Sequence, residues 1–336
     1  MPDDVFFAAG GIPLATLGAT GPRVSRLGLG LAALGRPGYM TLWHARDLGN
    51  DRSVEAMARH ARDVLDAAWE LGIRYFDVAR SYGGAEEFLA RWLAARTIAP
   101  GRVVVGSKWG YRYTADWRAD AEVHEIKEHT HAMLRRQLAE SRALLGAHLD
   151  LYQIHSATIE SGALADREIL DELARLRTEG VLVGLTVTGT AQADTIRRAL
   201  EIVRDGRMLF SSVQATWNLL ERSAEDALAE AHAQGLGVIV KEALANGRLT
   251  DRGPHAASLG PLAGARQTTI DALALAAALA RPWASVILSG AATIDQLRSN
   301  AASFAVRWDA ELDDATRPLR QQRTVYWQQR SELPWT

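Results

Sequence analysis

Two residues with reactive side chains lie five positions apart in the stretch RYFDVARSYG. Asp77 ends an apolar run that is typical of a buried β-strand, and Tyr82 lies in the loop that follows. Two more such residues end later apolar runs, Lys108 in VVVGSKWG and His155 in DLYQIH. Taken singly, each has an ordinary structural explanation. All four at the same level of successive strands indicate a shared site.

Together these four side chains could build a general acid. A Tyr phenol is a poor acid at neutral pH, with a reference pKa of about 10, and a nearby ammonium lowers that pKa. We expect Lys108 to supply the ammonium, and Asp77 to hold it charged and in place. His155 would share a hydrogen bond with the carbonyl oxygen that Tyr82 protonates. The set suits hydride delivery to a carbonyl, because negative charge then develops on the oxygen.

The elements that must position these residues alternate between short apolar, β-branched runs and longer runs of helical period. Near-continuous apolar strands separated by helices favour a parallel sheet covered on both faces, and eight strand–helix pairs predict an α/β fold, a (β/α)8 TIM barrel. The predicted strands are residues 25–32, 73–78, 102–108, 149–155, 181–187, 210–216, 235–240 and 284–289. Barrel chemistry belongs at the carboxyl ends of the strands, where the four residues fall.

The segments outside these pairs carry expectations of their own. The Gly and Pro before the first strand predict a β-hairpin that plugs the barrel, and the long first loop, residues 34–53, should lie over the active face. The cluster HEIKEHTH, residues 124–131, contains His and Glu residues of the kinds that bind metal ions, but we expect it to form a solvated surface within the third helix. The C-terminal extension is expected to cover the barrel. No composition shift marks a second domain, so one domain over residues 1–336 is predicted.

A doubly wound dinucleotide-binding fold is the main structural alternative. That fold requires the pattern G-x-G-x-x-G after its first strand. The chain offers GLGLAALG, in which Gly28 and Gly30 are present but Ala33 replaces the third glycine. No acidic residue follows at the right place on a second strand, and eight strand–helix units exceed six. We therefore prefer the barrel.

Composition excludes several classes of protein. Charge nearly cancels, with 38 Lys+Arg against 40 Asp+Glu, and no basic block offers a surface to nucleic acid. The absence of Cys excludes disulfides, thiolate catalysis and Cys-ligated metals. The N-terminal MPDDVFFAAG does not resemble a signal peptide, and no apolar run approaches the roughly 18 residues of a membrane span. We expect a cytoplasmic protein that acts on a small molecule, without metal, membrane or nucleic-acid partners; the sequence does not indicate its oligomeric state.

The stretches GIRYFDVARSYGGAEEFLARWL, VVVGSKWG and DLYQIH resemble the aldo-keto reductase superfamily. The resemblance extends over nearly the whole chain, from VSRLGLG to GAATIDQLRSN. It places the family's catalytic tetrad, in the correct order, on Asp77, Tyr82, Lys108 and His155. It implies a (β/α)8 barrel that binds a nicotinamide cofactor, commonly NADP, without a dinucleotide-binding fold of the doubly wound type.

The resemblance also implies a set of cofactor-binding positions. Thr186 replaces a Ser hydroxyl in GLTV, and Gln214 matches the carboxamide-binding Gln in SSVQATWN. The segment LSGAATIDQLRSN resembles the loop that binds the adenosine phosphate through backbone N–H groups at a helix N-terminus. The full set is Gly30, Leu31, Asp77, Thr186, Gln214, Lys241, Leu244, Gly247, Leu249, Ser289, Gly290, Ala291, Gln296 and Asn300.

Three departures from the family pattern bear on the cofactor. Val187 replaces an Asn and has no group to bond the carboxamide. Lys241 stands where many members place an aromatic that stacks on nicotinamide, so it would instead meet a phosphate or the substrate, with Trp217 as a substitute aromatic. Ser299 replaces a Glu, and Arg298 is a nearby candidate for a 2′-phosphate partner. On this basis NADP is expected, with NAD as the alternative.

The substrate stays open among aldehydes, ketones and sugars. Trp43 and Trp109 lie in or near loops above the barrel and, with His155, are expected to line the substrate pocket. The leading hypothesis is an NAD(P)-dependent oxidoreductase with Tyr82 as general acid/base. One alternative is an NAD-dependent aldose dehydrogenase that forms a lactone, since some sugar dehydrogenases of the family also depart from the aromatic at the Lys241 position. Another is a non-catalytic, cofactor-sensing regulatory subunit of the same fold, like the β subunits of potassium channels.

Overall fold

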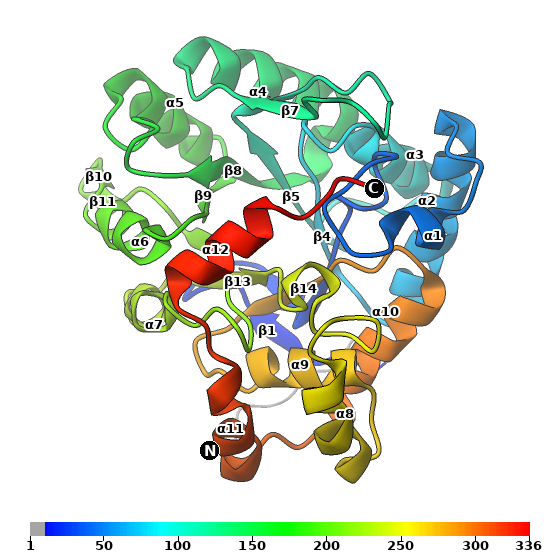
Figure 1. Cartoon of the computed structure of the whole chain (residues 1–336). Coiled ribbons are helices and arrows are strands. Elements are labelled where there is room, and N and C mark those ends of the chain that lie inside the picture. The colour runs from blue at the N-terminus through cyan, green and yellow to red at the C-terminus, as the bar shows by residue number, and fades with distance from the viewer. Residues whose placement is uncertain (1–10) are drawn as a thin grey trace.

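Eight parallel strands close into a barrel in the computed structural model, which describes residues 11–336 (Figure 1). Their order around the barrel is β12-β13-β14-β3-β4-β5-β8-β9. The strands are β3 (Leu27–Gly30), β4 (Tyr75–Asp77), β5 (Val104–Trp109), β8 (Leu149–Ala157), β9 (Leu182–Val187), β12 (Ser212–Thr216), β13 (Gly237–Lys241) and β14 (Val286–Ser289). The predicted (β/α)8 barrel is thereby confirmed. The N-terminal stretch that was predicted not to be a signal peptide lies outside the described residues.

Helices follow the strands and cover the outside of the barrel (Figure 1). They are α2 (Val54–Glu70), α3 (Ala85–Ala95), α4 (His131–Leu145), α5 (Arg167–Thr178), α6 (Gln192–Leu200), α7 (Glu225–Ala233), α8 (Ala256–Ala265), α9 (Ile270–Leu279) and α10 (Ile294–Ala301). Several present an apolar stripe to the strands; α2, for example, buries Met57, Ala61, Val64 and Ala68 at helical spacing. Among residues 11–336, no helix is long and apolar enough to cross a membrane.

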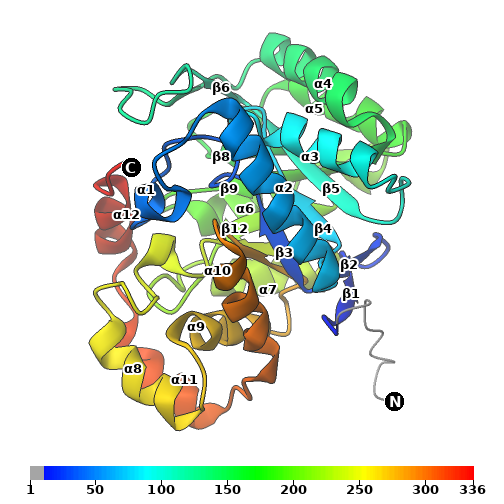
Figure 2. The same ribbon diagram turned by 90° about the vertical axis from the view of Figure 1, so that its right-hand side faces the viewer.

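The N-terminal hairpin closes one end of the barrel, as predicted. Strand β1 (Leu14–Thr16) pairs antiparallel with β2 (Arg23–Ser25). Leu17 and Val24 of this hairpin are buried in the same apolar cluster as Tyr75 of β4, inside the barrel. Figure 2 shows the hairpin at the end opposite to α1 and α12. The other end, where the strands finish, is therefore the end at which a site can form.

Residues 124–130 do not belong to a helix, so the prediction that the cluster 124–131 lies within the third helix was wrong for all but its last residue. Strands β6 (Tyr111–Tyr113) and β7 (Glu125–Lys127) pair antiparallel, and α4 begins only at His131. His124 is not solvated either, because its ring stacks on Trp335 with centroids 4.1 Å apart. The pairing of β6 with β7 and the contact with the far end of the chain are both tertiary features, which a local periodicity cannot reveal.

Two long segments cover the open end of the barrel. The first loop contains the short helix α1 (His44–Leu48), and the C-terminal extension contains α12 (Arg323–Ser331), which crosses the front of the barrel in Figure 1. The two segments are joined, because the backbone groups of Tyr39 and Thr336 exchange two hydrogen bonds of 3.2 Å each. The first loop was expected over the active face and the C-terminal extension was expected to cover the barrel; both contribute residues to the cavity at this end.

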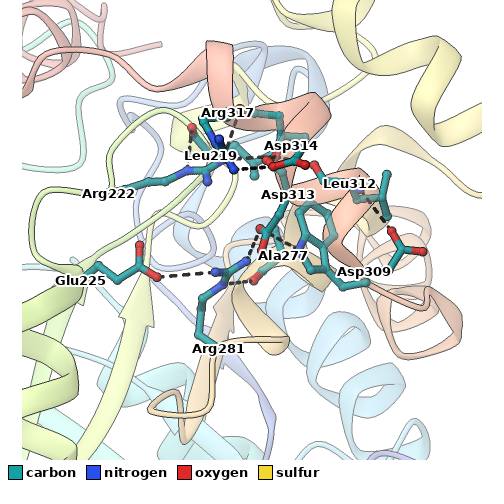
Figure 3. Close-up of polar contacts among 12 residues, drawn as sticks. Leu219, Arg222, Glu225, Ala277, Arg281, Asp309, Leu312, Asp313, Asp314 and Arg317 are labelled. Atoms are coloured by element: carbon teal, nitrogen blue, oxygen red, sulfur yellow. Dashed lines mark hydrogen bonds and ion pairs between the residues drawn. The ribbon is translucent and has the colours of Figure 1, made fainter.

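A cluster of arginines and carboxylates holds the C-terminal extension against the barrel wall (Figure 3). Asp313 on α11 (Ala310–Thr316) accepts a hydrogen bond of 2.5 Å from Arg281, which follows α9. Arg281 also reaches Glu225 at the start of α7, at 3.5 Å. Since the chain runs from α11 into α12, these contacts fix where the segment over the open end begins.

Candidate active site

The four predicted catalytic side chains meet at the open end of the barrel. Asp77 ends β4, Lys108 lies near the end of β5, and both are at most 2 % exposed. The Lys108 ammonium forms an ion pair with the Asp77 carboxylate and donates a hydrogen bond of 3.0 Å to the carbonyl of Val78. The Tyr82 hydroxyl lies 3.4 Å from Nε2 of His155 on β8. The strand ends therefore bring the four together as their order in the sequence suggested.

Tyr82 is positioned by a turn that packs tightly on the first loop. Gly83 has a backbone φ of +60°, which residues other than glycine rarely adopt. The N–H of Gly84 donates a hydrogen bond of 2.7 Å to the carbonyl of Gly35. A Cβ atom on Gly35 would lie 2.2 Å from the Tyr82 carbonyl oxygen. The two glycines after Tyr82 and the one at Gly35 thus let the turn approach closely enough to aim the phenol into the barrel mouth.

The electrostatics around Tyr82 differ from the expectation. The Lys108 ammonium lies 4.7 Å from the centroid of the Tyr82 ring, against the ring rather than at the hydroxyl. Burial raises the pKa of Tyr82 well above its ordinary value of 10, the Asp77 carboxylate raises it further, and the Arg36 guanidinium opposes the rise. The predicted lowering of the Tyr82 pKa by Lys108 is therefore corrected: the phenol keeps its proton.

Arg36 is a buried cation of this site that sequence reasoning missed. It is 2 % exposed, and its guanidinium lies 5.3 Å from the centroid of the Tyr82 ring. One of its nitrogens donates to the Ser81 carbonyl at 3.0 Å and to the Glu125 carboxylate at 2.8 Å. Its position in a loop predicted to cover the active face was the only available signal. Glu125 was hidden by the incorrect helix assignment.

His155 is neutral in this environment. Burial, followed by the charges of Lys108 and Arg36, holds the pKa of His155 well below its ordinary value of 6.5. Its Nδ1 lies 3.4 Å from the Ser81 hydroxyl. A neutral imidazole between two hydroxyl groups can take part in hydrogen bonds without adding a second positive charge beside Lys108.

A cavity of about 860 Å³ opens above these residues. We call the part around Tyr82, His155 and Arg36 the Tyr82 end. We call the part around residues 289–300 the α10 end. Most of the predicted cofactor positions line the cavity: Gly30, Asp77, Thr186, Gln214, Lys241, Leu244, Gly247, Ser289, Gly290, Ala291, Gln296 and Asn300. Leu31 and Leu249 do not line it, because both are fully buried in the core.

The two tryptophans expected in the substrate pocket lie elsewhere. Trp109 is fully buried in the core, edge-on to His129, and Trp43 is 49 % exposed with its indole N–H directed at the carbonyl of Arg252, 3.3 Å away. Neither lines the cavity, and neither does the buried Trp217. The aromatic residues at the wall besides Tyr82 come from the two covering segments and the β6–β7 hairpin: Tyr39, Tyr111 and Trp335.

Predicted cofactor residues near the Tyr82 end are tied to the barrel. Gln214 donates to the second oxygen of Asp77 at 2.8 Å, and the Thr186 hydroxyl accepts from the N–H of Ser156 at 2.6 Å. The Lys241 ammonium donates to Thr216 at 3.0 Å. Burial lowers the pKa of Lys241 to about 8, although the neighbouring Glu242 carboxylate opposes the shift. This end of the cavity therefore carries several fixed polar groups around the phenol.

The α10 end is built from small residues and a capped helix start. Thr293 and Gln296 form a capping box at the N-terminus of α10. The side chains of Ser289 and Asn300 lie 2.8 Å apart, and a Cβ atom on Gly290 would meet nothing within 4 Å. Arg298, the candidate phosphate partner, points elsewhere, because its side chain is 65 % exposed and does not line the cavity.

These features fit a nicotinamide dinucleotide. Cofactor pockets commonly enclose about 300–1,000 Å³, and the cavity of about 860 Å³ falls in that range. A helix N-terminus flanked by small residues is suited to phosphate groups, because the helix dipole attracts an anion and the small residues let it approach. Among the described residues, no cluster of His, Asp and Glu could hold a metal ion.

Comparison with known proteins agrees with this geometry. An L-galactose dehydrogenase from Arabidopsis thaliana is 27 % identical over 322 residues, which is 91 % of this chain and 92 % of that protein. A D-threo-aldose 1-dehydrogenase from a Pseudomonas species is 28 % identical over 250 residues, 69 % of this chain and 71 % of that protein. The fold matches an aldo-keto reductase from Bacillus halodurans in its holo form, with a TM-score of 0.68, 22 % identity and coverage of 93 % and 97 %. The Aldo/keto reductase family model matches residues 26–314, and the chain therefore belongs to the aldo/keto reductase family, an oxidoreductase acting on carbonyl or alcohol substrates.

Proposed function

We propose that this protein transfers hydride between a nicotinamide dinucleotide and a carbonyl or hydroxyl carbon, with Tyr82 as the group that gives or takes the proton. The observation that carries the proposal is the hydroxyl of Tyr82 beside a neutral His155, 3.4 Å away, above the buried pair of Asp77 and Lys108. The bound nicotinamide would supply or accept the hydride. Gln214 and Thr186, with the small residues at the α10 end, would hold the cofactor along the cavity.

The residues around Tyr82 perform the proton chemistry. Because burial raises the pKa of Tyr82, the phenol stays protonated and is ready to donate to a carbonyl oxygen that gains negative charge. His155 would hydrogen-bond the same oxygen, and the positive charges of Arg36 and Lys108 would stabilise the charge that develops there. In the reverse direction Tyr82 would first have to release its proton to solvent, and the resulting phenolate oxygen would take the proton from the substrate hydroxyl as the hydride leaves for the nicotinamide.

A second candidate is a more specific form of the first: oxidation of an aldose at its anomeric carbon to a lactone. The Tyr82 end is lined by many polar side chains, including Glu125, Lys241, Glu242 and Arg330. These groups are paired with other protein groups, and the hydroxyl groups of a sugar can form additional hydrogen bonds with them, which an apolar substrate cannot. The sugar dehydrogenases among the relatives support this choice.

The test is a panel of aldoses with NAD⁺ and NADP⁺, alongside a panel of small aldehydes and ketones with NADH and NADPH. Oxidation of aldoses well above the reduction of simple aldehydes would support the sugar dehydrogenase. Turnover of aldehydes or ketones alone would support a carbonyl reductase. If a cofactor binds but no substrate of either panel turns over, the proposal fails and the cofactor-sensing subunit becomes the better account.

A further inference from the structure

The α10 end of the cavity is acidic, although it is the end suited to phosphate groups. Five charged side chains of the described residues line it: Asp47, Asp251, Arg252, Asp271 and Asp295. Four carboxylates and one guanidinium thus line this end, and the exposed Asp295 pairs with Arg298 outside the cavity wall. The other Lys and Arg side chains at the cavity wall, Arg36, Lys241 and Arg330, are paired with Glu125, Thr216 and Glu242 toward the Tyr82 end.

Asp47, from helix α1 of the first loop, is the most firmly held of these carboxylates. Its two oxygens accept hydrogen bonds of 2.7 and 3.0 Å from the two terminal nitrogens of Arg252. One oxygen also accepts a bond of 2.7 Å from Nε2 of Gln296, and the side chain is 11 % exposed. Arg252, the one Lys or Arg side chain of the described residues that lines this end of the cavity, is therefore already paired with Asp47.

Gln296 connects this carboxylate to the helix start. Its side-chain oxygen accepts from the N–H groups of Ala292 and Thr293, at 2.8 and 3.3 Å, which leaves its NH₂ directed at Asp47. If the phosphate of the adenosine half of the cofactor binds at the start of α10, the adenosine ribose to which it is bonded lies next to it. The 2′ position of that ribose would then lie within reach of Asp47 and Gln296.

We propose that Asp47 makes the cavity select NAD(H) over NADP(H), an inference that rests on the proposed dinucleotide function. A carboxylate can accept a hydrogen bond from the ribose 2′-hydroxyl of NAD, as acidic residues do in other dinucleotide sites. The 2′-phosphate of NADP would place about two negative charges beside the Asp47 carboxylate. The guanidinium of Arg252 already binds both oxygens of Asp47, so it is not free to bind the phosphate as well. This reverses the preference for NADP expected from the sequence.

The test measures binding rather than turnover. The affinities of NADH and NADPH are determined by quenching of Trp fluorescence in the parent protein, in Asp47→Asn and in the control Asp251→Asn. Asn keeps the size of Asp47 but removes its charge and frees Arg252. We expect the parent to bind NADH about 100-fold more tightly than NADPH, the cost of placing the 2′-phosphate beside a carboxylate. In Asp47→Asn that ratio should fall at least about tenfold through tighter NADPH binding, and in Asp251→Asn it should change much less.

The outcomes separate this inference from the proposed function. A parent that binds NADPH as tightly as NADH overturns the inference and leaves the function standing. A parent that binds neither cofactor overturns both. An equal loss of both cofactors in Asp47→Asn would show that Asp47 only holds the loop closed, and an equal change in both variants would remove the assignment to Asp47. If Asp47→Asn does not fold, the parent's own preference, measured also with adenosine 2′,5′-bisphosphate against 5′-AMP, decides the question.

Discussion

Lys108 and Tyr82 meet through the face of the aromatic ring and not through the hydroxyl. The ammonium is held by Asp77 beneath the phenol, 4.7 Å from the ring centroid. Gln214 bonds the other oxygen of the same carboxylate at 2.8 Å. The ion pair of Asp77 and Lys108 therefore lies against the face of the phenol ring, and the Tyr82 hydroxyl keeps its proton.

This buried pair predicts a large stability effect. Lys108→Met should lower the free energy of unfolding by about 3 kcal/mol or more, because it leaves the Asp77 carboxylate buried without its cation. Urea unfolding measures the change. The double variant Asp77→Asn/Lys108→Met should recover most of the loss, since no charge then stays unpaired. If the double variant is as unstable as Lys108→Met alone, lost packing and not the unpaired charge is the cause.

His44 predicts a pH dependence of stability. Burial is the main cause that lowers the pKa of His44 to about 4 in the folded protein, whereas an unfolded His has a pKa of about 6.5. Between these values only the unfolded chain takes up the proton, so the stability that His44 contributes is complete above pH 6.5 and is lost as pH falls. The loss should be about 1.4 kcal/mol per pH unit.

The measurement is urea unfolding of the parent and of His44→Gln at pH 7.5 and pH 5.5. The parent should lose about 1.4 kcal/mol more than the variant between these two conditions. Asp150, whose pKa burial raises to about 6, acts in the opposite sense in both proteins and cancels in the comparison. Identical pH dependence of the two proteins would show that His44 accepts a proton in the folded state.

The lowered pKa of Lys241 predicts that the affinity for NAD⁺ depends on pH. Its pKa is lowered to about 8, chiefly by burial, so it loses its charge between pH 7 and pH 9. If the nicotinamide lies at the Tyr82 end, the ammonium repels the positive ring of NAD⁺ but not the neutral ring of NADH. The affinity for NAD⁺ should then rise by roughly tenfold from pH 7 to pH 9, equivalent to about 1.4 kcal/mol of repulsion.

The control for this titration is Lys241→Met, in which NAD⁺ affinity should be nearly independent of pH. Isothermal titration of NAD⁺ and NADH at both pH values provides the measurement. The substitution should also change NADH and NADPH affinity equally, because Lys241 is bonded to Thr216 and lies beside Glu242, away from the α10 end. A selective loss of NADPH would instead make Lys241 a phosphate partner.

The sequence could predict the barrel and the meeting of Asp77, Tyr82, Lys108 and His155, because each position depends on one strand and its end. It could not predict the acidic α10 end, since Asp47 and Gln296 are 249 residues apart and meet only through the closed first loop. The pKa of Tyr82 was mispredicted for a related reason. Residue types alone do not tell whether a lysine meets the hydroxyl or the ring, which here depends on the turn packed against Gly35.

The central claim is that Tyr82 gives and takes the proton, and single-turnover hydride transfer in Tyr82→Phe tests it most directly. The substitution removes only a hydroxyl that bonds His155, so cofactor affinity, titrated in parallel, should stay close to that of the parent. The rate of hydride transfer with a confirmed substrate should fall by about 10²–10⁴-fold, the usual contribution of a positioned acid or base. Transfer at the parent rate in Tyr82→Phe would contradict the account and leave Tyr82 as an ordinary residue of the turn.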